Sequence, residues 1–267
     1  MTEMNVCVIV AAAGRSSRFG ESDKLSQDLG GRAVLVRTVE AFARRKEVRS
    51  VVVAAPADRF DDYRERFGPT LGFHGATIVK GGTVARWESI RLAIEAVPAD
   101  ATHIAVHDAA RPVVDDALLD RMFEAAESLD AVIPGTPISG TVKRVAIEPT
   151  IVGGDGDDDL LADSILGEST RVHLEANAVE ETVDRAHLVE VQTPQIFDAD
   201  LLRRAYAAGD LDGVTDDAGA VERLGETVHV VAGDPRNVKI TVPADIDLVR
   251  KLLGLRGEKE RPVHKRF

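Results

Sequence analysis

The stretch VIVAAAGRSSRFGESDK, from Val8 to Lys24, passes from an apolar run into small residues interspersed with cations, among them Arg18 and Lys24. Small residues after a buried strand let backbone N–H groups approach a ligand closely. A guanidinium binds an anion through a planar fork, and an ammonium binds it as a point charge. The stretch is not a Walker P-loop, and Ser16 stands where a dinucleotide fingerprint needs its second glycine. It predicts an anion-binding loop, with a surface turn carrying solvated cations as the alternative.

The stretch VHDAARP, from Val106 to Pro112, is a second candidate because it ends an apolar run. Parallel α/β sheets bind ligands at the carboxyl ends of their strands, so Asp108 is expected at the ligand edge. Its carboxylate can hold Mg²⁺ or a ligand hydroxyl, and Arg111 can bind a phosphate. The alternative is an Asp–Arg pair that only fixes the turn. We interpret His107 as a neutral structural residue, because the chain has no second His or Cys at metal-ligand spacing.

Three further stretches are ambiguous by themselves. Thr215–Asp217 is typical of a helix start, where Thr or Asp caps the first turn. Lys239 lies between apolar residues, which places it either on the outer face of a short strand or in a polar cleft. The acidic run Gly153–Asp159 has alternating aspartates, but Leu166 stands at the position where a calcium loop needs a glutamate. We therefore expect that run to be a solvated loop.

The composition limits the class of protein. The chain has 267 residues, enough for one large domain or a domain with an appended arm. Its formal net charge of −12 argues against general binding of nucleic acid or anionic membranes, so an anion site must be a local cationic pocket. Cys7 is the only cysteine, which excludes an internal disulfide and indicates a buried thiol. Neither a signal peptide nor a bilayer-spanning run is evident, so we expect a cytoplasmic location.

Short apolar runs alternate with helical patterns, which predicts an α/β fold with a doubly wound, mostly parallel, Rossmann-like sheet. The predicted strands are Val6–Ala12, Ser50–Ala55, Ala76–Val79, His103–Val106, Ala131–Pro134 and Val228–Val231. The first three helical patterns have apolar residues at Leu35, Val39 and Phe42, at Ile90, Leu92, Ile94 and Val97, and at Leu118, Met122, Ala125 and Leu129. Further helices are expected around Asp200–Ala208, Asp216–Leu224 and Pro243–Leu253.

The regular alternation of apolar runs and helical patterns stops after Pro134. From Thr136 to about Val191 the alternation is weak and many residues are charged, which predicts an inserted arm of short strands. We therefore expect one domain over residues 1–253 that carries an arm at about 136–191. The tail 254–267 is charged and lacks an apolar face, so it is expected to be frayed.

Taken together, eight short motifs resemble the 2-C-methyl-D-erythritol 4-phosphate cytidylyltransferase family, which belongs to the glycosyltransferase-A-like nucleotidyltransferases. They occur in the family's order from about Val6 to Leu253, nearly the whole chain. Each motif is weak by itself, and their common order makes the match specific. In this sequence they read AAAGRSSRFG…K, GG…R..S at Gly81–Ser89, HDAARP, TVKR, TVDR, QTPQ.F, TDDA and N.KIT.P.D.

The resemblance implies transfer of CMP from CTP to methylerythritol phosphate, giving CDP-methylerythritol and pyrophosphate in non-mevalonate isoprenoid biosynthesis. It also implies Mg²⁺ or another divalent cation as cofactor, and a homodimer formed through the arm. The nucleophile of that reaction is an ionised phosphate oxygen, so no protein base is needed. The protein must offset the repulsion between two anions and hold them in line. Arginine, lysine and Mg²⁺ do this, which suits a chain whose candidate residues are cations rather than His or Cys.

The same resemblance implies roles for individual residues. Arg18 and Lys24 would stabilise charge at the α-phosphate, while Arg185 and Lys239 would position the methylerythritol phosphate. The residues expected to line that substrate are Asp108, Arg111, Thr193, Thr215 and Thr141, the last reaching the active site of the other protomer. Those expected around the cytidine and the phosphates are Ala11, Ala12, Ala13, Gly14, Gly82 and Ser89. Asp108 is also the candidate contact for a metal that the CTP phosphates would mainly hold.

One position departs from the family pattern, because Gly140 stands where the family usually has an Asp ahead of its T.K motif. This change affects recognition of the acceptor more than binding of CTP. A cytidylyltransferase for another polyol phosphate, such as ribitol 5-phosphate, is therefore the alternative function. A catalytically idle nucleotide-binding scaffold is a further alternative, which the presence of the four expected catalytic cations argues against.

Overall fold

The computed structural model describes residues 3–14, 19, 23–152, 174–209 and 211–255. The chain forms two compact units, one of Met1–Thr136 with Val191–Phe267 and the other of the inserted segment Pro137–Glu190. The acidic run 153–159 and the tail from residue 256 lie outside the described residues. The solvated loop and the frayed tail therefore stay predictions.

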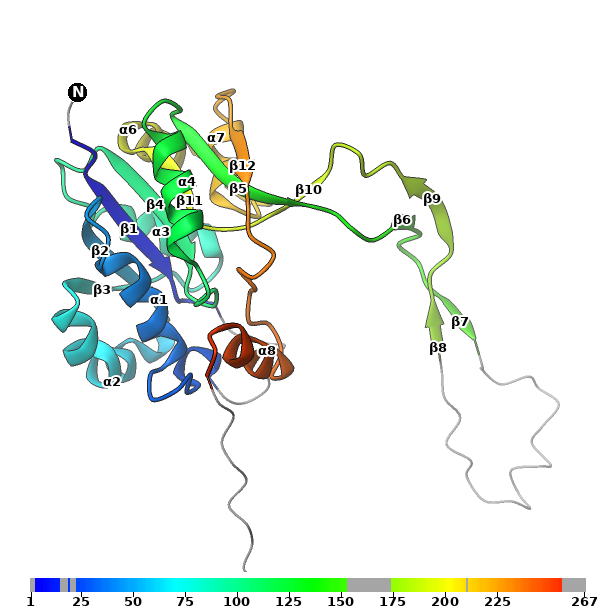
Figure 1. Cartoon of the computed structure of the whole chain (residues 1–267). Coiled ribbons are helices and arrows are strands. Elements are labelled where there is room, and N and C mark those ends of the chain that lie inside the picture. Colours follow the sequence, from blue (N-terminus) through cyan, green and yellow to red (C-terminus); the bar gives the residue numbers. More distant parts are fainter. Residues whose placement is uncertain (1–2, 15–18, 20–22, 153–173, 210, 256–267) are drawn as a thin grey trace, which may run out of the picture. The chain divides into compact units, whose positions relative to one another are not determined.

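One eight-stranded sheet forms the centre of the larger unit (Figure 1). Its strands are β1 (Val6–Ala11), β2 (Val48–Ala55), β3 (Ala76–Lys80), β4 (His103–Asp108), β5 (Ala131–Pro137), β10 (Val189–Val191), β11 (Gln195–Asp198) and β12 (His229–Ala232). The order is β10-β5-β11-β4-β1-β2-β3, and β12 pairs with β5. Strand β1 runs parallel to β2 and β4, and β11 runs antiparallel to β4 and β5. The predicted mostly parallel α/β sheet is confirmed.

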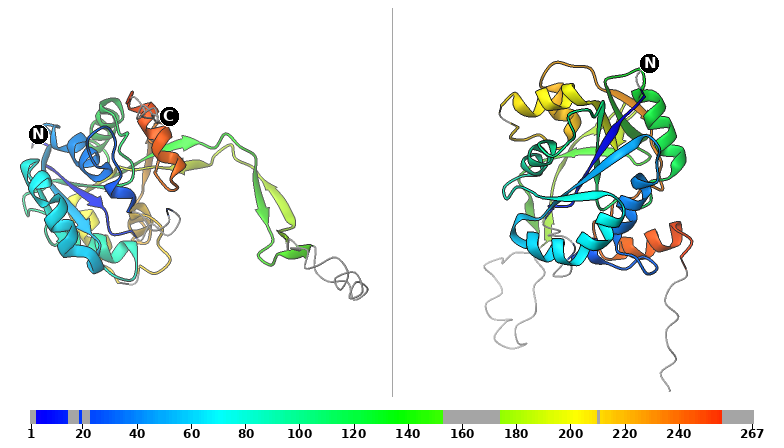
Figure 2. Two further views of the ribbon diagram at one scale, coloured as in Figure 1. Left: turned by 90° about the horizontal axis from the view of Figure 1, so that it is seen from below. Right: turned by 90° about the vertical axis from the view of Figure 1, so that its left-hand side faces the viewer.

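Helices cover both faces of this sheet (Figure 2). They are η1 (Lys24–Ser26), α1 (Val34–Ala43), η2 (Ala57–Arg59), α2 (Phe60–Phe73), α3 (Arg86–Ile94), α4 (Asp116–Ala126), α6 (Ala199–Ala207), α7 (Asp217–Glu222) and α8 (Ala244–Leu252). Side chains alternate across a strand, so Val8 of β1 packs into a core with α1, α2, α4 and α8. The next residue, Ile9, packs into the opposite core with α3, α6 and α7. The sheet is therefore doubly wound.

The helix α2 and the strand β11 are the main elements that the sequence did not predict. Gly68 and Pro69 lie inside α2, and both residues disfavour a helix. Its buried side chains are Tyr63, Phe67 and Leu71, a stripe at a spacing of four residues. The predicted strands all occur, with ends that differ by a few residues.

The smaller unit consists of two short antiparallel pairs. Strand β6 (Val142–Val145) pairs with β9 (Val179–Val183), and β7 (Thr150–Val152) pairs with β8 (Leu174–Ala176). Val142 is the register partner of Val183, so Thr141, which precedes Val142, and Arg185, two residues after Val183, lie at the same end of this ladder. The Arg185 guanidinium donates a hydrogen bond to the Ser139 carbonyl in the same unit.

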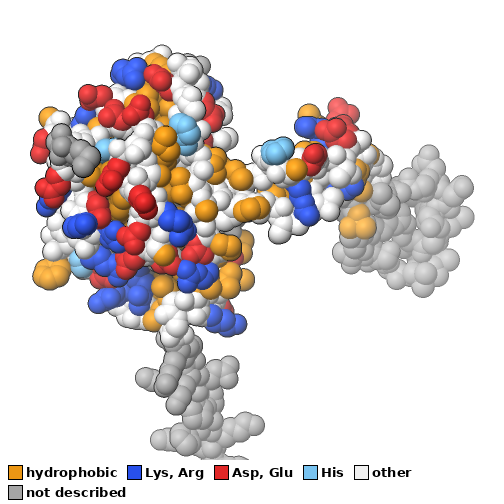
Figure 3. Space-filling view, turned by 45° about the horizontal axis from the view of Figure 1, so that its top comes forward, with side chains coloured by type: hydrophobic (Ala, Val, Ile, Leu, Met, Phe, Trp, Pro, Cys, Tyr) orange, Lys and Arg blue, Asp and Glu red, His pale blue; other side chains and the backbone are white. Residues whose placement is uncertain are grey.

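The surface of the larger unit is charged and mixed in sign. On the face shown in Figure 3, acidic and basic side chains are interspersed, and Lys and Arg gather toward its lower part. No helix in the described part of the chain combines the length and the apolarity that a membrane span requires. With a net charge of −12, an anion site in this chain depends on a local group of cations.

Leu118 of α4 is fully buried and is expected to contribute strongly to stability. Leu118→Ala should lower the free energy of unfolding by about 2–5 kcal/mol, because it removes buried methyl groups and leaves a cavity. Leu92→Ala is the matched control, since Leu92 is 37% exposed and should cost less than about 1 kcal/mol. Urea unfolding of both variants checks this. Equal losses would contradict the assignment of α4 to the core.

Candidate functional site

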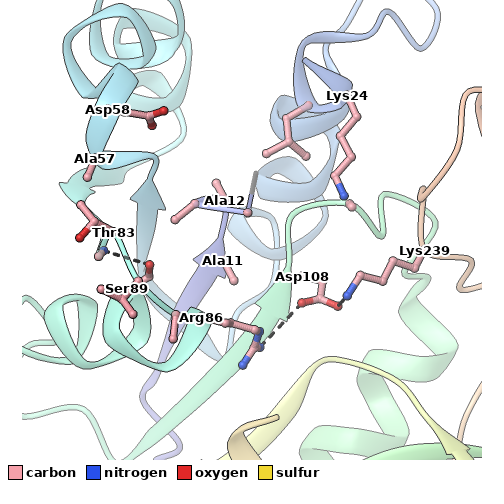
Figure 4. Close-up of a pocket in the computed structure, with 17 residues that line it drawn as sticks. Ala11, Ala12, Lys24, Ala57, Asp58, Thr83, Arg86, Ser89, Asp108 and Lys239 are labelled. Carbon is pink, nitrogen blue, oxygen red and sulfur yellow. Dashed lines mark hydrogen bonds and ion pairs between the residues drawn. The ribbon is translucent and has the colours of Figure 1, made fainter. Parts of the chain in front are cut away.

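A pocket opens at the carboxyl edge of the sheet, beside the ends of β1 and β4 (Figure 4). The last residues of these strands, Ala11 and Asp108, are register partners. The pocket encloses about 250 Å³. The residues predicted from the sequence that line it are Ala11, Ala12, Ala13, Gly14, Lys24, Gly82, Ser89, Asp108 and Lys239. This is the edge at which parallel α/β sheets bind ligands.

The carboxylate of Asp108 is the electrostatic centre of the pocket. Its Oδ2 accepts a hydrogen bond from Lys239 Nζ at 2.8 Å, and nitrogens of Arg111 and Arg86 lie 3.6 and 3.7 Å from its oxygens. Burial by itself would raise the pKa of this carboxyl. The charges of Arg86, Lys239 and Arg111 outweigh burial and hold the pKa far below its usual range. Asp108 is therefore ionised at neutral pH and gathers three cations around one point.

A buried chain of hydrogen bonds fixes the end of β4 behind Asp108. His107 Nε2 lies 3.0 Å from the Arg111 carbonyl, which can only accept, so Nε2 donates. His107 Nδ1 then accepts from the Thr193 hydroxyl at 3.1 Å, and the Thr193 oxygen accepts the Asp108 backbone N–H at 3.1 Å. Burial lowers the pKa of His107 to about 4, so the ring is neutral at pH 7. This geometry supports the structural interpretation of His107.

The segment that carries Lys239 is fastened to the same region of the sheet. Arg111 Nη1 donates to the Asn237 carbonyl at 2.7 Å, and Asn237 Nδ2 donates to the Thr193 carbonyl at 2.8 Å. The backbone N–H of Ile240 donates to the Ala110 carbonyl at 2.8 Å. Lys239 itself does not lie on a strand. Of the two placements predicted for it, the polar cleft is the one observed.

Lys24 is positioned by the short helix η1, of which it is the first residue. Asp23 caps this helix by accepting the Leu25 backbone N–H at 3.1 Å, and it also accepts a 2.7 Å hydrogen bond from the Tyr63 hydroxyl of α2. Lys24 Nζ donates to the Ile240 carbonyl at 3.3 Å. Lys24 and Lys239 are far apart in the sequence, and both line the pocket (Figure 4). They lie near each other because Lys24 binds the carbonyl of Ile240, the residue after Lys239.

The turn from Gly81 to Ser89 forms another wall. The Ser89 hydroxyl accepts the Gly82 backbone N–H at 3.0 Å, and the Glu88 carboxylate accepts those of Thr83 and Val84 at 2.7 and 2.9 Å. A Cβ at Gly82 would lie 2.3 Å from the Glu88 carboxylate, so a side chain there would break this arrangement. The turn is thus fixed by its own hydrogen bonds before a ligand binds.

Arg86 and Asp217 are site residues for which no part in ligand binding was predicted, although Asp217 was expected at a helix start. Arg86 lines the pocket, and its Nη2 lies 2.7 Å from an Asp217 oxygen. Asp217 is fully buried and also accepts a 2.6 Å hydrogen bond from the Tyr206 hydroxyl. Both residues lie in motifs of the resemblance, GG…R..S and TDDA, and these motifs were the available signal.

The other predicted residues that the structure describes do not line this pocket. Arg18 lies outside the described residues. Arg111 and Thr193 are buried behind Asp108, whereas Thr215 is exposed, and the neighbouring Asp216 caps α7. Thr141 and Arg185 belong to the smaller unit and are exposed there. The structure therefore brings together the residues expected around the nucleotide, together with Lys24, Asp108 and Lys239.

The described residues include no group of three or more His, Cys, Asp or Glu side chains that could hold a metal ion. The carboxylates that line the pocket are Asp58 and Asp108, and the latter already faces three cations. Proteins usually bind Mg²⁺ through one or two carboxylates together with substrate phosphates. A Mg²⁺ ion in this pocket would therefore be held mainly by the phosphates of a ligand, with Asp58 and Asp108 as the carboxylates of the lining.

Comparison with known proteins gives consistent matches over nearly the whole chain. The family model of 2-C-methyl-D-erythritol 4-phosphate cytidylyltransferase matches residues 6–164 and 168–254. A protein of that name from Rhodococcus jostii is 39% identical over 251 residues, covering 93% of this chain and 95% of the relative. One from Acidobacterium capsulatum is 34% identical over 265 residues, covering 96% of this chain and 100% of the relative.

Solved structures agree with these matches. A crystal structure of 4-diphosphocytidyl-2C-methyl-D-erythritol synthase has a TM-score of 0.68 and 29% identity, covering 95% of this chain and 100% of its own. The 2-C-methyl-D-erythritol 4-phosphate cytidylyltransferase of Thermus thermophilus has a TM-score of 0.66 and 28% identity, covering 94% of this chain and 100% of its own.

The protein has a doubly wound sheet with cations gathered at its carboxyl edge. Together with these similarities, that arrangement defines a nucleotidyltransferase. The chain belongs to the 2-C-methyl-D-erythritol 4-phosphate cytidylyltransferase family. The family and the class of enzyme predicted from the motifs are confirmed.

His107→Gln is expected to reduce the loss of stability in acid. The folded pKa of about 4 lies below the ordinary histidine value of 6.5, so between these values the unfolded chain binds more protons. Wild-type stability should therefore fall as the pH falls through that window, by about 3 kcal/mol at most from this residue. Urea unfolding at about pH 7 and about pH 4.5 measures the difference. Parallel losses in the variant and the wild type would show that His107 is not buried neutral.

Proposed function

We propose that the protein transfers CMP from CTP to the phosphate of 2-C-methyl-D-erythritol 4-phosphate and releases pyrophosphate. The observation that carries this proposal is the group of cations Lys24, Arg86 and Lys239 in one pocket of an acidic chain, facing the small-residue segment Ala11–Gly14. The names of the relatives supply the nucleotide and the acceptor. The cations of the pocket would offset the repulsion between the two anionic substrates.

The chemistry requires charge compensation rather than a protein base. A phosphate oxygen of the acceptor forms a bond to the α-phosphorus of CTP while the bond to the pyrophosphate oxygen breaks. The attacking oxygen is already ionised at neutral pH. His107, which directly precedes Asp108 in β4, is buried and neutral and uses both ring nitrogens in structural hydrogen bonds. Fixed cations that hold both reactants in line are what the reaction needs.

We assign the two walls of the pocket to the two substrates. The nucleotide would lie against Ala11–Gly14 and the turn Gly82–Ser89, with Lys24 at the transferring phosphate. Lys239 and Asp108 would face the acceptor, with Asp108 accepting from a hydroxyl while its charge orients Lys239. Arg18 is predicted beside Lys24 by its place in the sequence. When bound to the triphosphate, Mg²⁺ would supply further positive charge near Asp108.

Thr141 and Arg185 would complete the acceptor site from the arm. They lie at the same end of the β6–β9 ladder, which supports a shared role. A homodimer through this arm and a cytoplasmic location remain predictions from the sequence. Gly140, beside Thr141, is exposed, and a Cβ there would meet no atom within 4 Å, so nothing in the arm's own packing requires a glycine.

The experiment that tests the proposal measures pyrophosphate release with CTP and Mg²⁺ in the presence of either methylerythritol phosphate or ribitol 5-phosphate. We expect turnover with methylerythritol phosphate and little with ribitol 5-phosphate. Turnover with ribitol 5-phosphate alone would show that the acceptor is the alternative polyol phosphate. Binding of CTP without turnover for either acceptor would support an idle scaffold instead.

Lys24→Ala is expected to lower kcat by about 100-fold or more, because it removes a charge that stabilises the transferring phosphate. The KM for the acceptor should change by less than about threefold. Steady-state kinetics with varied acceptor separates the two parameters. Lys46→Ala, which removes an exposed lysine outside the pocket, is the control. Comparable changes in kcat and acceptor KM would contradict the placement of Lys24.

Lys239→Ala is expected to raise the acceptor KM by about tenfold or more, because Lys239 would bind the acceptor phosphate by a charge-assisted hydrogen bond. The KM for CTP should change little. Initial rates with each substrate varied in turn measure both values, with the exposed Lys251→Ala as the control. An unchanged acceptor KM would remove Lys239 from the acceptor site.

A further inference from the structure

Arg86 connects three parts of the larger unit that are distant in sequence. It is the first residue of α3 and lies within the turn from Gly81 to Ser89, which the side chains of Glu88 and Ser89 fix. Its guanidinium lies 2.7 Å from Asp217 of α7 and 3.7 Å from Asp108 at the end of β4. Its side chain remains 31% exposed, toward the pocket (Figure 4).

The ion pair with Asp217 restrains the guanidinium of Arg86. Asp217 has no exposed surface, and each of its oxygens has a partner, Oδ2 with Arg86 Nη2 and Oδ1 with the Tyr206 hydroxyl. A buried carboxylate that loses such a partner becomes an uncompensated charge, so this pair strongly restrains the guanidinium. Burial alone would lower the pKa of Arg86, and the charge of Asp217 outweighs it, so Arg86 stays charged.

The contact with Asp108 is of a different kind. At 3.7 Å it is too long for a hydrogen bond, so Arg86 acts on this carboxylate through its charge. Lys239 makes the short contact with the same carboxylate, at 2.8 Å. Arg86 therefore stabilises the ionised Asp108 that orients Lys239, although it does not touch Lys239 itself.

We propose that Arg86 is a positioning residue that links the nucleotide-binding turn to the acceptor half of the site. Anchored by Asp217 and Tyr206, it acts through Asp108 on the orientation of Lys239. The proposal rests on the proposed function, because it assigns the Gly82–Ser89 turn to the nucleotide and Lys239 to the acceptor. It gives Arg86 a defined effect on one substrate more than on the other.

The test compares Arg86→Gln, Arg86→Lys and Tyr206→Phe in the full-length protein, with initial rates measured while CTP and acceptor are varied in turn. Arg86→Gln should raise the acceptor KM by about tenfold and the CTP KM by less than about twofold. Arg86→Lys should lie between Arg86→Gln and the wild type, because a single ammonium keeps a charge but cannot reproduce the guanidinium fork. Tyr206→Phe, which loosens Asp217 outside the pocket, should shift the acceptor KM in the same direction by a smaller factor.

Arg91→Gln is the matched control on the same helix. Arg91 stacks over Trp87, with its Cζ 4.6 Å from the ring centroid, and donates to the Gly209 carbonyl outside the pocket. If Arg86 only stabilised α3, Arg86→Gln and Arg91→Gln would have similar kinetics, and the KM values for CTP and for the acceptor would rise together. That result, or an unchanged acceptor KM in Arg86→Gln, would overturn the proposal.

Misfolding of Arg86→Gln and inactivity of the wild type are two further outcomes of this experiment. Where Arg86→Gln fails to fold, Arg86→Lys and Tyr206→Phe carry the test, and wild-type acceptor KM values in both would overturn the inference. An active wild type with unchanged variants overturns the inference alone. A wild type that turns over neither acceptor overturns the proposed function and the inference with it.

Discussion

The charge of Asp108 is the interaction on which the rest of the site depends. Three cations converge on one carboxylate at the end of β4, two from the pocket and one buried behind it, and without the carboxylate they would repel one another. Their combined charge exceeds that of Asp108 even when the charge of Asp217, the second partner of Arg86, is counted, so the group keeps a net attraction for an anionic ligand. In the proposed function, this local surplus would attract the two phosphorylated substrates to a chain whose net charge is −12.

The fold supplies the restraints that this cluster needs. Parallel pairing places the ends of β1 and β4 side by side, so the small residues after Ala11 face Asp108. The antiparallel strand β11 follows Thr193, whose hydroxyl accepts the Asp108 backbone N–H and donates to His107 Nδ1. Lys24 depends on α2 in a similar way, through the hydrogen bond from Tyr63 to the cap of η1. Each cation is thus held by an element other than its own.

The sequence predicted the sheet because strands buried on both faces give nearly continuous apolar runs, as in VCVIVA of β1. It also pointed to Lys24 and Asp108, because residue type and position after a strand are local signals, whereas the role of Lys239 came only from the resemblance to the family. The contacts of Arg86 were not predictable in this way. Its partner Asp217 lies 131 residues away, and no local pattern reports a pairing at that separation. The helix α2 was missed for a local reason, since glycine and proline interrupt its pattern.

The most direct measurement of the central claim is the turnover of Asp108→Asn with both substrates at saturation, alongside its thermal unfolding. The substitution keeps the shape of the side chain and removes its charge, so Lys239, Arg111 and Arg86 lose their common partner. We expect a folded protein whose kcat falls by about 100-fold or more. Wild-type turnover in the folded variant would show that the cations organise themselves without Asp108 and would contradict this view of the site.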